Sequence, residues 1–315
     1  MPPESAPSIE RLSYAVITPV RDEAENLRRL AASMAAQTLR PVAWLIVDTG
    51  STDQTLPLAE ELAAEQSWVV VRQLRIGGAV MRGGPIVRAF HFGLESLPAE
   101  WDLAVKVDAD TSFEPDYFDR LVTAFEQDAS LGIAGGSCYE QQADGVWRQR
   151  HGTGSSVWGA SRAYRRRCLD EILPLEERMG WDTIDLVGAE VRGWSTRALA
   201  DLPFFHHRPE GQRDASRFSP YVRRGEAAHY MGYRLPYLAI RTLFHAVRDP
   251  AAIAIPYGYV SAALRRQERC ADTAVRKSIR DQQRLSQLHL RARETLRPRG
   301  ELGDPLGPEG PPTRT

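Results

Sequence analysis

Cysteine is scarce in this sequence, and long apolar runs are missing from it. Cys138, Cys168 and Cys270 lie far apart in 315 residues and form no CxxC pair. This spacing argues against a disulfide framework or a zinc site and suggests a reducing compartment. No apolar stretch has the length of a membrane-spanning helix, and the opening residues MPPESAPSIERLS lack the basic and apolar regions of a signal peptide. We therefore expect a cytoplasmic protein.

An excess of positive charge is also missing. The chain has 40 Lys and Arg against 41 Asp and Glu, a net charge of -1, so we expect no nucleic-acid partner. Hydrophobic residues make up 43% and charged residues 26%, which is ordinary for a soluble globular protein with a sizeable core. The length fits one large domain, or one domain with an appendage.

Strand-like and helix-like segments alternate up to about residue 128. The apolar runs YAVITPV, VAWLIVD, WVVVRQL and DLAVKV are each followed by a segment of helical periodicity. This order predicts an α/β fold with a mostly parallel sheet and helices on both sides. Ligands in such sheets bind beyond the carboxyl ends of the strands, so the residues directly after each strand are the first candidates for a site.

The second strand-like run ends in Asp48-Thr49-Gly50-Ser51, which is also how an aspartic protease presents its catalytic carboxylate. Such a protease needs two of these loops in an all-β body, and this chain has one, followed by a helical segment. We favour a nucleotide-binding turn, in which Asp48 accepts hydrogen bonds from a base or ribose. Ser51 or Thr52 is then expected to cap the next helix and leave backbone N–H groups available.

Two further acids, Asp108 and Asp110, follow the run DLAVKV with one small residue between them. Carboxylate oxygens suit Mg²⁺ or Mn²⁺, with phosphates and water as the remaining ligands. VDADTS also resembles the DxDxT motif of haloacid-dehalogenase phosphatases, in which Asp108 would be a nucleophile. In that family the motif normally opens the domain and a later lysine is expected, whereas here three strand–helix units come first and only Lys106 and Lys277 exist. A phosphohydrolase remains an alternative.

Six segments in order resemble a family 2 glycosyltransferase of the GT-A fold: PVRDEAENL, IVDTGSTDQT, GGPIVRAFHFGLE, VKVDAD, GASRAYRR and GWDTID. The resemblance covers roughly residues 13–210. It implies a Rossmann-like α/β/α sandwich that moves a sugar from a UDP- or GDP-linked donor to a hydroxyl acceptor, as in synthesis of polysaccharide or glycolipid. The donor-binding residues that we expect from it are Pro19, Arg21, Glu23, Asp48, Gly50, Ser51, Gly84, Arg88 and Asp108.

The same resemblance implies that Asp110, with Asp108 directly or through water, holds Mn²⁺ or Mg²⁺ on the diphosphate. Trp181-Asp182 stands where the family has a Glu-Asp pair, so Asp182 is the expected base, and Asp185 is the second candidate three residues further on. One base without a carboxylate nucleophile implies inversion at the anomeric carbon.

Three departures from the family pattern concern donor contacts and leave room for another function. Trp181 replaces an acid, Thr49 replaces the second Asp of Asp-Asp-Gly-Ser, and Phe90-His91 replaces Arg-Asn. A non-catalytic nucleotide-sugar-binding protein is therefore a further alternative.

The histidine pair in PFFHHRPEG offers another metal ligand, since neutral imidazole binds Mn²⁺. His206 or His207 would ligate the metal or bind the diphosphate. The competing interpretation is that both are simply packed or solvated residues of a loop. Arg208 and Arg213 are plausible phosphate partners because a guanidinium fork matches phosphate oxygens.

We expect a flexible N-terminus at 1–12, the catalytic domain at 13–215, a partly basic helical extension at 216–297 and a disordered tail at 298–315. The extension contains LPYLAIRTLFHAVRDPAAIAIPYGYVSAALRR, which mixes aromatic and aliphatic residues with Arg. We hypothesise that it makes a peripheral contact with the inner face of the cytoplasmic membrane. A helical lid on the catalytic domain is the alternative.

Overall fold

The computed structural model describes most of the chain. The described residues are 11–75, 83–98, 100–141, 145–150, 157–208, 217–247, 249–284, 286 and 301–302. Residues 1–10 of the expected flexible N-terminus at 1–12, the position of Arg213 and most of the expected tail lie outside them.

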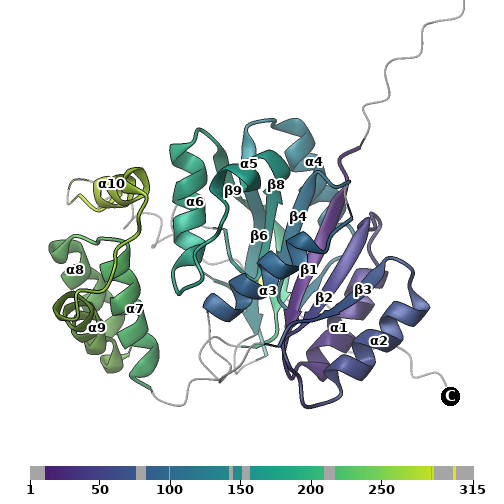
Figure 1. The fold of residues 1–315 in the computed structure, drawn as a ribbon, viewed down its shortest axis with the longest axis horizontal. Coiled ribbons are helices and arrows are strands. Elements are labelled where there is room, and N and C mark those ends of the chain that lie inside the picture. The colour runs from purple at the N-terminus through teal and green to yellow at the C-terminus, as the bar shows by residue number, and fades with distance from the viewer. Residues whose placement is uncertain are drawn as a thin grey trace, which may run out of the picture.

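The predicted alternation of strands and helices in the first part of the chain is confirmed (Figure 1). Four strands and four helices alternate, with one short strand added before the last helix. In chain order they are β1 Tyr14–Val20, α1 Ala24–Ala35, β2 Ala43–Asp48, α2 Thr55–Glu65, β3 Val69–Gln73, α3 Gly84–Glu95, β4 Leu103–Val107, β5 Thr111–Phe113 and α4 Tyr117–Gln127.

The middle of the chain completes the sheet and adds two helices. Its elements are β6 Leu131–Gln141, β7 Trp147–Gln149, β8 Ser161–Arg165, α5 Arg166–Ile172, α6 Trp181–Val191 and β9 Ser195–His206. With β10, the short strand Glu301–Leu302, the described strands form one sheet in the order β10-β7-β6-β8-β4-β1-β2-β3, with β9 paired to β6 and β5. The pairs β1–β2, β2–β3, β1–β4 and β6–β9 are parallel, while β8 is antiparallel to both β4 and β6. The expected mixed, mostly parallel α/β sheet is therefore present.

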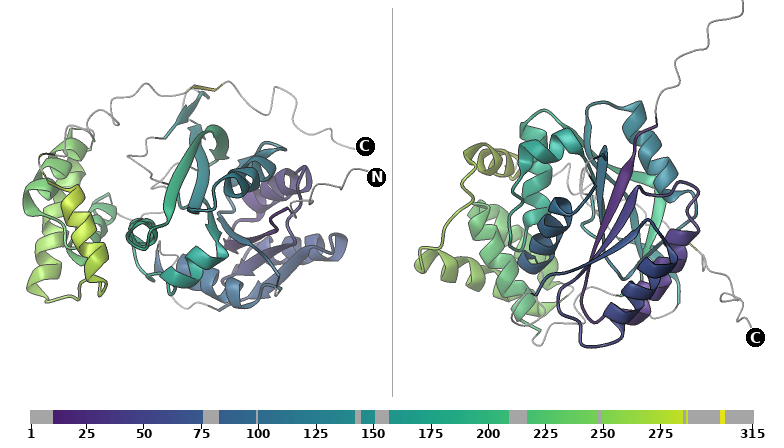
Figure 2. Two further views of the ribbon diagram at one scale, coloured as in Figure 1. Left: turned by 90° about the horizontal axis from the view of Figure 1, so that it is seen from above. Right: turned by 45° about the vertical axis from the view of Figure 1, so that its right-hand side comes forward.

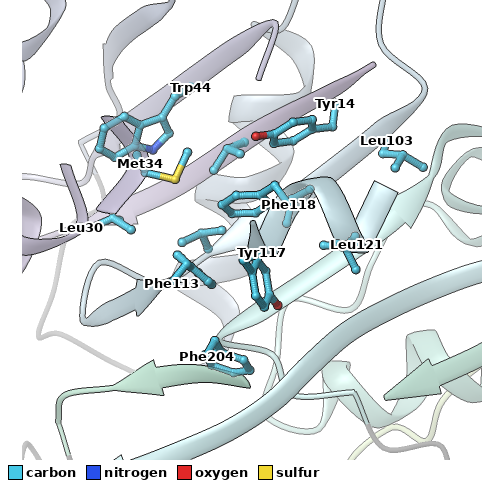
Figure 3. Packing of buried hydrophobic residues seen from close by; sticks show 14 of the residues in the cluster. Tyr14, Leu30, Met34, Trp44, Leu103, Phe113, Tyr117, Phe118, Leu121 and Phe204 are labelled. Carbon is cyan, nitrogen blue, oxygen red and sulfur yellow. The ribbon is translucent and has the colours of Figure 1, made fainter. Parts of the chain in front are cut away.

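The central strands are buried on both faces, which explains their nearly continuous apolar sequences. Alternate residues of β1 enter different clusters: Val16 packs with Trp44 and Phe118 on one face, and Ile17 packs with Leu45 and Phe90 on the other. Figure 3 shows the first cluster, where the aromatic rings of β5, α4 and β9 meet. The ring centres of Phe113 and Tyr117 are 4.5 Å apart. The two faces together hold the carboxyl ends of the strands in a fixed arrangement.

The C-terminal part is helical, as expected. It comprises α7 Ser219–Tyr230, α8 Leu235–Ala246, the 3-10 helix η1 Pro250–Ile253, α9 Ala254–Leu264 and α10 Thr273–Gln282. Figures 1 and 2 show these helices grouped at one side of the sheet, next to α6. A shared apolar cluster joins Ile184 and Val187 of α6 to Ala227, Tyr230 and Met231. In the described part of the chain, every helix is too short or too polar to cross a bilayer.

Within the expected tail, Glu301–Leu302 forms the short strand β10, antiparallel to β7. Helix α10 begins at a cap that its sequence provides, because the carboxylate of Asp272 accepts hydrogen bonds from the backbone N–H groups of Ala274 and Val275.

Helices α7 and α9 touch backbone to backbone through two glycines. A Cβ on Gly225 would lie 2.0 Å from the carbonyl oxygen of Ile255, and a Cβ on Gly258 would lie 2.0 Å from that of Val222. Since neither carbonyl belongs to a flexible side chain, only a shift of a whole helix would make room.

We expect Gly225→Ala to lower the free energy of unfolding by about 1–3 kcal/mol, because the added methyl group separates α7 from α9. Thermal denaturation measures the effect. The control is Gly188→Ala in α6, where the nearest atoms to a new Cβ are 3.7 Å away. There the helix propensity of alanine should leave stability unchanged or raise it by about 0.5–1 kcal/mol. Equal effects at the two glycines would contradict the tight contact.

Candidate functional site

The turn after β2 uses Asp48 to hold its own backbone. The buried Asp48 carboxylate accepts hydrogen bonds from the backbone N–H of Gly50 at 3.1 Å and from that of Ser51 at 3.2 Å. Gly50 has φ +103°, which favours glycine. The expected capping by Ser51 or Thr52 is wrong: Asp53 accepts the hydrogen bond from the backbone N–H of Thr55, the first residue of α2.

Asp22, an acid that the sequence analysis did not select, links the loops after β1 and β2. Its carboxylate accepts a hydrogen bond from the backbone N–H of Thr52 at 2.7 Å, and its own N–H donates to the hydroxyl of Ser51 at 3.0 Å. Asp22 adopts φ +54°, an uncommon left-handed conformation for a residue with a side chain. Pro19 and Arg21 lie at the same end of β1, with Pro19 in register with Val47.

Glu23 is buried and forms a two-pronged ion pair with Arg208, which lies 185 positions further along the chain. One prong joins Arg208 Nη1 to Glu23 Oε1 at 2.8 Å. The side-chain amide of Asn26 donates to the other carboxylate oxygen at 2.7 Å. The hydrogen bonds to Glu23 raise the pKa of Arg208. The first loop of the sheet is thereby tied to the segment that follows its last strand.

The Asp108–Asp110 pair lies beyond β4, and each carboxylate has a cationic neighbour. Buried Lys106 pairs with Asp108 Oδ1 and also donates to the carbonyl of Gly159 at 2.6 Å. Burial raises the pKa of Asp108, and the charge of Asp110 adds to this, against the opposing effect of Lys106. Burial also acts to raise the pKa of Asp110, but hydrogen bonding to His206 and the charge of Arg208 hold it below its usual range.

His206 lies between two carboxylates. Its Nε2 is 3.4 Å from Asp110 Oδ1, and its Nδ1 is 3.1 Å from Glu140 Oε1. Arg150 Nη1 donates to the same Glu140 oxygen at 2.6 Å. Burial disfavours the charged imidazole, but the hydrogen bonds to Asp110 and Glu140 outweigh it and raise the pKa of His206 to about 9.

His207 has different surroundings from His206. Its Nε2 is 2.7 Å from the hydroxyl of Ser112, and its ring packs edge-on against Trp147. Burial, together with the charge of Arg29, lowers the pKa of His207 to about 4. Its backbone N–H donates to the carbonyl of Asp110 at 2.8 Å. Of the two histidines considered as metal ligands, His206 is thus the one that directs a nitrogen at the carboxylate of Asp110.

Two sets of side chains have the chemistry to hold a cation. Asp110 and His206 present an oxygen and a nitrogen 3.4 Å apart, close to the ~3 Å between neighbouring ligands of an octahedral ion with bonds near 2.1 Å. In the second set, the ligand atoms of Cys138, Glu140 and His206 lie within 4.8 Å of one another. Mn²⁺ and Mg²⁺ prefer oxygen to thiolate, so the set of Asp110 and His206 fits them better than the set that contains Cys138.

Asp182 lies in the first turn of α6, close to the loop that contacts Lys106. Gly180 precedes the helix with φ +91°, and the Cβ of Asp182 is 3.9 Å from where a Cβ on Gly159 would be. The carbonyl of Gly159 accepts the hydrogen bond from Lys106. Trp181, at the departure from the family pattern, has its ring centre 5.7 Å from Lys106 Nζ and 5.3 Å from the guanidinium of Arg162.

Asp185 lies in the core, although it is only three residues further on. Its side chain and that of Arg162 are each 1% exposed, and Arg162 Nη1 lies 2.6 Å from Asp185 Oδ1. The hydroxyl of Tyr164 donates to Asp185 Oδ2 at 2.6 Å, and the backbone N–H of Leu186 donates to Oδ1. A carboxylate that is enclosed and saturated in this way is a structural group, so we do not retain Asp185 as a candidate base.

Gly84 and Arg88, expected at the donor, contact the segment before α6. A Cβ on Gly84 would meet the carbonyl oxygen of Glu177 at 2.5 Å, and Arg88 Nη2 pairs with Glu177 Oε2 at 2.8 Å. Both residues therefore help to fix the position of the segment that leads to Asp182.

Sequence reasoning missed Asp22, Glu140 and Arg150. Glu140 had a recognisable signal, because it is an acid near the end of the otherwise uncharged strand β6, LGIAGGSCYEQ. Nothing in the sequence paired it with a histidine 66 positions away.

Comparison with known proteins gives one family. The model described as "Glycosyl transferase family 2" matches residues 15–179, which include the first loop, the Asp48 turn and the Asp108–Asp110 pair.

Solved glycosyltransferases share the fold. A mannosyltransferase from Pyrobaculum calidifontis, PcManGT, in complex with GDP-Man and Mn²⁺, is 15% identical, with a TM-score of 0.53 over 91% of this chain and 88% of that one. GalNAc-T7 with UDP, GalNAc and Mn²⁺ is also 15% identical, with a TM-score of 0.55 over 71% of this chain and 48% of that one. TarS of S. aureus, residues 1–349 with UDP-GlcNAc, is 19% identical, with a TM-score of 0.50 over 69% of this chain and 66% of that one.

We expect Asp185→Asn to destabilise the protein by about 3–5 kcal/mol, since it leaves the buried charge of Arg162 without its counter-ion. Chemical denaturation measures the loss. Asp182→Asn, in the same helix but partly exposed, serves as the control and should change stability far less. A stable Asp185→Asn protein that has lost only turnover would return Asp185 to the list of bases.

Proposed function

Because the chain belongs to glycosyl transferase family 2, it is a nucleotide-sugar glycosyltransferase of the GT-A fold, and we propose that it is a metal-dependent, inverting one. The observation that carries this proposal is the convergence of Asp108, Asp110 and His206 beyond the carboxyl ends of the strands. The structural relatives were solved with GDP-Man, with UDP-GlcNAc, or with UDP and GalNAc, and two of them with Mn²⁺, which supports the same donor and cofactor classes here.

The residues at this edge of the sheet fit Mn²⁺ or Mg²⁺. We propose that Asp110 and His206 ligate the ion, with Asp108 directly or through water, since Lys106 already engages one Asp108 oxygen. The bound cation would neutralise the leaving diphosphate. Arg208, 3.6 Å from Asp110 and pre-oriented by Glu23, would bind a phosphate oxygen from the other side.

For the nucleoside we propose the loops after β1 and β2. Pro19, Arg21 and the Asp48–Ser51 turn would face the base and ribose, and either uridine or guanosine is compatible with them. The Asp48 carboxylate already accepts two backbone hydrogen bonds, so it would use its remaining lone pairs for the donor. Gly84 and Arg88 would act on the donor mainly through the segment of Glu177 that they hold.

We assign Asp182 the role of general base. As the acceptor oxygen bonds to the anomeric carbon, its proton passes to the Asp182 carboxylate and the bond to the diphosphate oxygen breaks. No second carboxylate is available beside Asp182 in α6, because Asp185 is held by Arg162. A single base without a nucleophile predicts inversion.

We propose a hydroxyl of a growing glycan or of a lipid-linked sugar as the acceptor, in synthesis of cell-surface polysaccharide or glycolipid. A peripheral position on the inner face of the cytoplasmic membrane would bring the enzyme to such an acceptor. The phosphohydrolase alternative requires a free Asp108 nucleophile, and the contact with Lys106 disfavours it.

The central test is release of nucleoside diphosphate from UDP- and GDP-linked sugars with Mn²⁺ or Mg²⁺, after thermal-shift screening for the donor that binds. We expect Asp110→Asn to lower release by roughly 10²–10³-fold, because it removes a charged ligand from the site. Asp182→Asn should keep the donor-induced thermal shift and lose roughly 10²–10⁴-fold in turnover. Asp116→Asn, an exposed acid close by in the sequence, is the control.

Phosphate-labelled Asp108, or wild-type turnover in both variants, would refute this assignment. Donor binding without turnover on any acceptor would favour the non-catalytic alternative.

A second prediction concerns Glu140, which we expect to orient His206. Glu140→Ala should weaken Mn²⁺ binding by roughly 10–100-fold, since it removes the carboxylate that fixes the imidazole. Electron paramagnetic resonance of free Mn²⁺, recorded without donor, measures the affinity.

Glu140→Gln retains a hydrogen-bond acceptor and should recover part of the loss. His207→Ala provides the matched control at the neighbouring histidine and should bind Mn²⁺ normally. If His207→Ala loses Mn²⁺ binding and Glu140→Ala does not, the metal ligand is His207 and not His206.

A further inference from the structure

Two adjacent helices of the C-terminal part carry a row of exposed large apolar side chains. On α8 and just after it, Leu243 is 68% exposed and Val247 88%; on α9, Leu264 is 79% exposed. The others are Leu235, Ile240, Phe244, Ile253, Tyr257 and Val260. A soluble surface rarely collects so many large apolar groups unless something covers them. We call these nine residues the apolar face.

The apolar face carries no acidic residue. Helix α8 has the sequence LPYLAIRTLFHA and α9 has AIPYGYVSAAL, so neither contains Asp or Glu. Helix α7 packs against α9 through the two glycines. Figure 1 shows α8 and α9 on the side of the helical group that faces away from the sheet, with α7 nearer the sheet. The apolar face is therefore directed outward.

A basic cavity adjoins one end of the apolar face. Its volume is about 470 Å³, and its lining contains five cationic residues and one acid: Arg234, Arg269, Arg276, Lys277, Arg280 and Asp281. Arg234 directly precedes Leu235 of α8, and Arg269 follows the end of α9 by five residues. The cavity thus joins the start of one apolar helix to the segment after the other.

Within the described ranges, most of these cations have no acid to neutralise them. Asp281 lies 4.0 Å from Arg234 and also pairs with Arg284. Arg280 and Arg234 donate to backbone carbonyls of Gly232 and Arg280. Among the described residues, no carboxylate lies within ion-pair distance of Arg269, Arg276 or Lys277. Arg265 and Arg266, both exposed, extend the positive charge from the end of α9.

We propose that the apolar face and the basic cavity form one docking surface for an anionic lipid bilayer. The apolar side chains enter the interface, and the cavity receives the phosphate of a lipid headgroup, which the arginines bind through charge-assisted hydrogen bonds. A bilayer satisfies both features together, because it offers hydrocarbon beside a dense layer of negative charge. A second copy of the chain would cover the apolar face but would bring the same cations against each other.

Flotation of the full-length protein with vesicles tests the proposal. We expect binding to vesicles of phosphatidylglycerol and phosphatidylcholine, none to phosphatidylcholine alone, and weakening by salt. The cavity variant Arg269→Gln/Arg276→Gln/Lys277→Gln should reduce partitioning by roughly 100-fold. The apolar variant Leu243→Gln/Val247→Gln/Leu264→Gln should abolish it. The charge-matched control, Arg28→Gln/Arg40→Gln/Arg72→Gln, removes three exposed cations elsewhere and should float as the wild type does.

Further arms separate this proposal from its competitors and from the transfer reaction. Asp110→Asn should float normally, and both surface variants should keep the donor-induced thermal shift. If inorganic phosphate saturates the cavity and the protein floats with none of the vesicles, the ligand is a free anion and the proposal is overturned. If the wild type does not float but sediments as a dimer, and the apolar variant sediments as a monomer, the apolar face serves self-association instead. If the charge-matched control loses as much vesicle binding as the cavity variant, the effect is due to net charge and not to the cavity.

Discussion

The crowding of carboxylates beyond β1, β2 and β4 is the constraint on which the rest of the site depends. Glu23, Asp48, Asp108 and Asp110 come to one edge of the sheet because parallel strands end there together. Like charges in a partly buried setting repel strongly, so each acid requires its own compensation. Backbone N–H groups serve Asp48, Arg208 serves Glu23, Lys106 serves Asp108, and His206 serves Asp110. Two of these four partners come from the end of β9, so the site is complete only when the last strand is in place.

Much of the fold could be predicted, because burial on both faces of a parallel strand leaves a direct mark in the sequence. YAVITPV and LAVKV are nearly continuous apolar runs for that reason, and the helices between them have clear amphipathic periods. The order of β5 to β9 was harder to foresee, since β6 pairs with three strands and its glycines give no periodic signal. Helix caps also depended on loop geometry: at α2 the backbone N–H of Thr55 donates to Asp53, and not to Ser51 or Thr52.

The candidate site was predictable as a set of positions but not as a set of partnerships. The residues after the strands were identified correctly as neighbours of one edge, whereas the contacts of each side chain depend on elements far away in sequence. Asp182 and Asp185 are an example. Their spacing by three predicts that they share a helix face, but it does not predict that Arg162 and Tyr164 of β8 enclose Asp185. In the same way, two consecutive histidines at the end of β9 face different surroundings, which only the tertiary structure distinguishes.

The glycine contact between α7 and α9 has a mechanical consequence. Two helices whose backbones touch cannot slide along each other without a collision of carbonyl groups, which resists sliding of α9 along α7. The C-terminal helices pack on α6 through Ile184 and Val187, within two turns of Asp182. The packing of these helices on α6 thus determines the separation between Asp182 and the outermost helices, and this separation sets how far an acceptor must extend from any surface on which those helices rest.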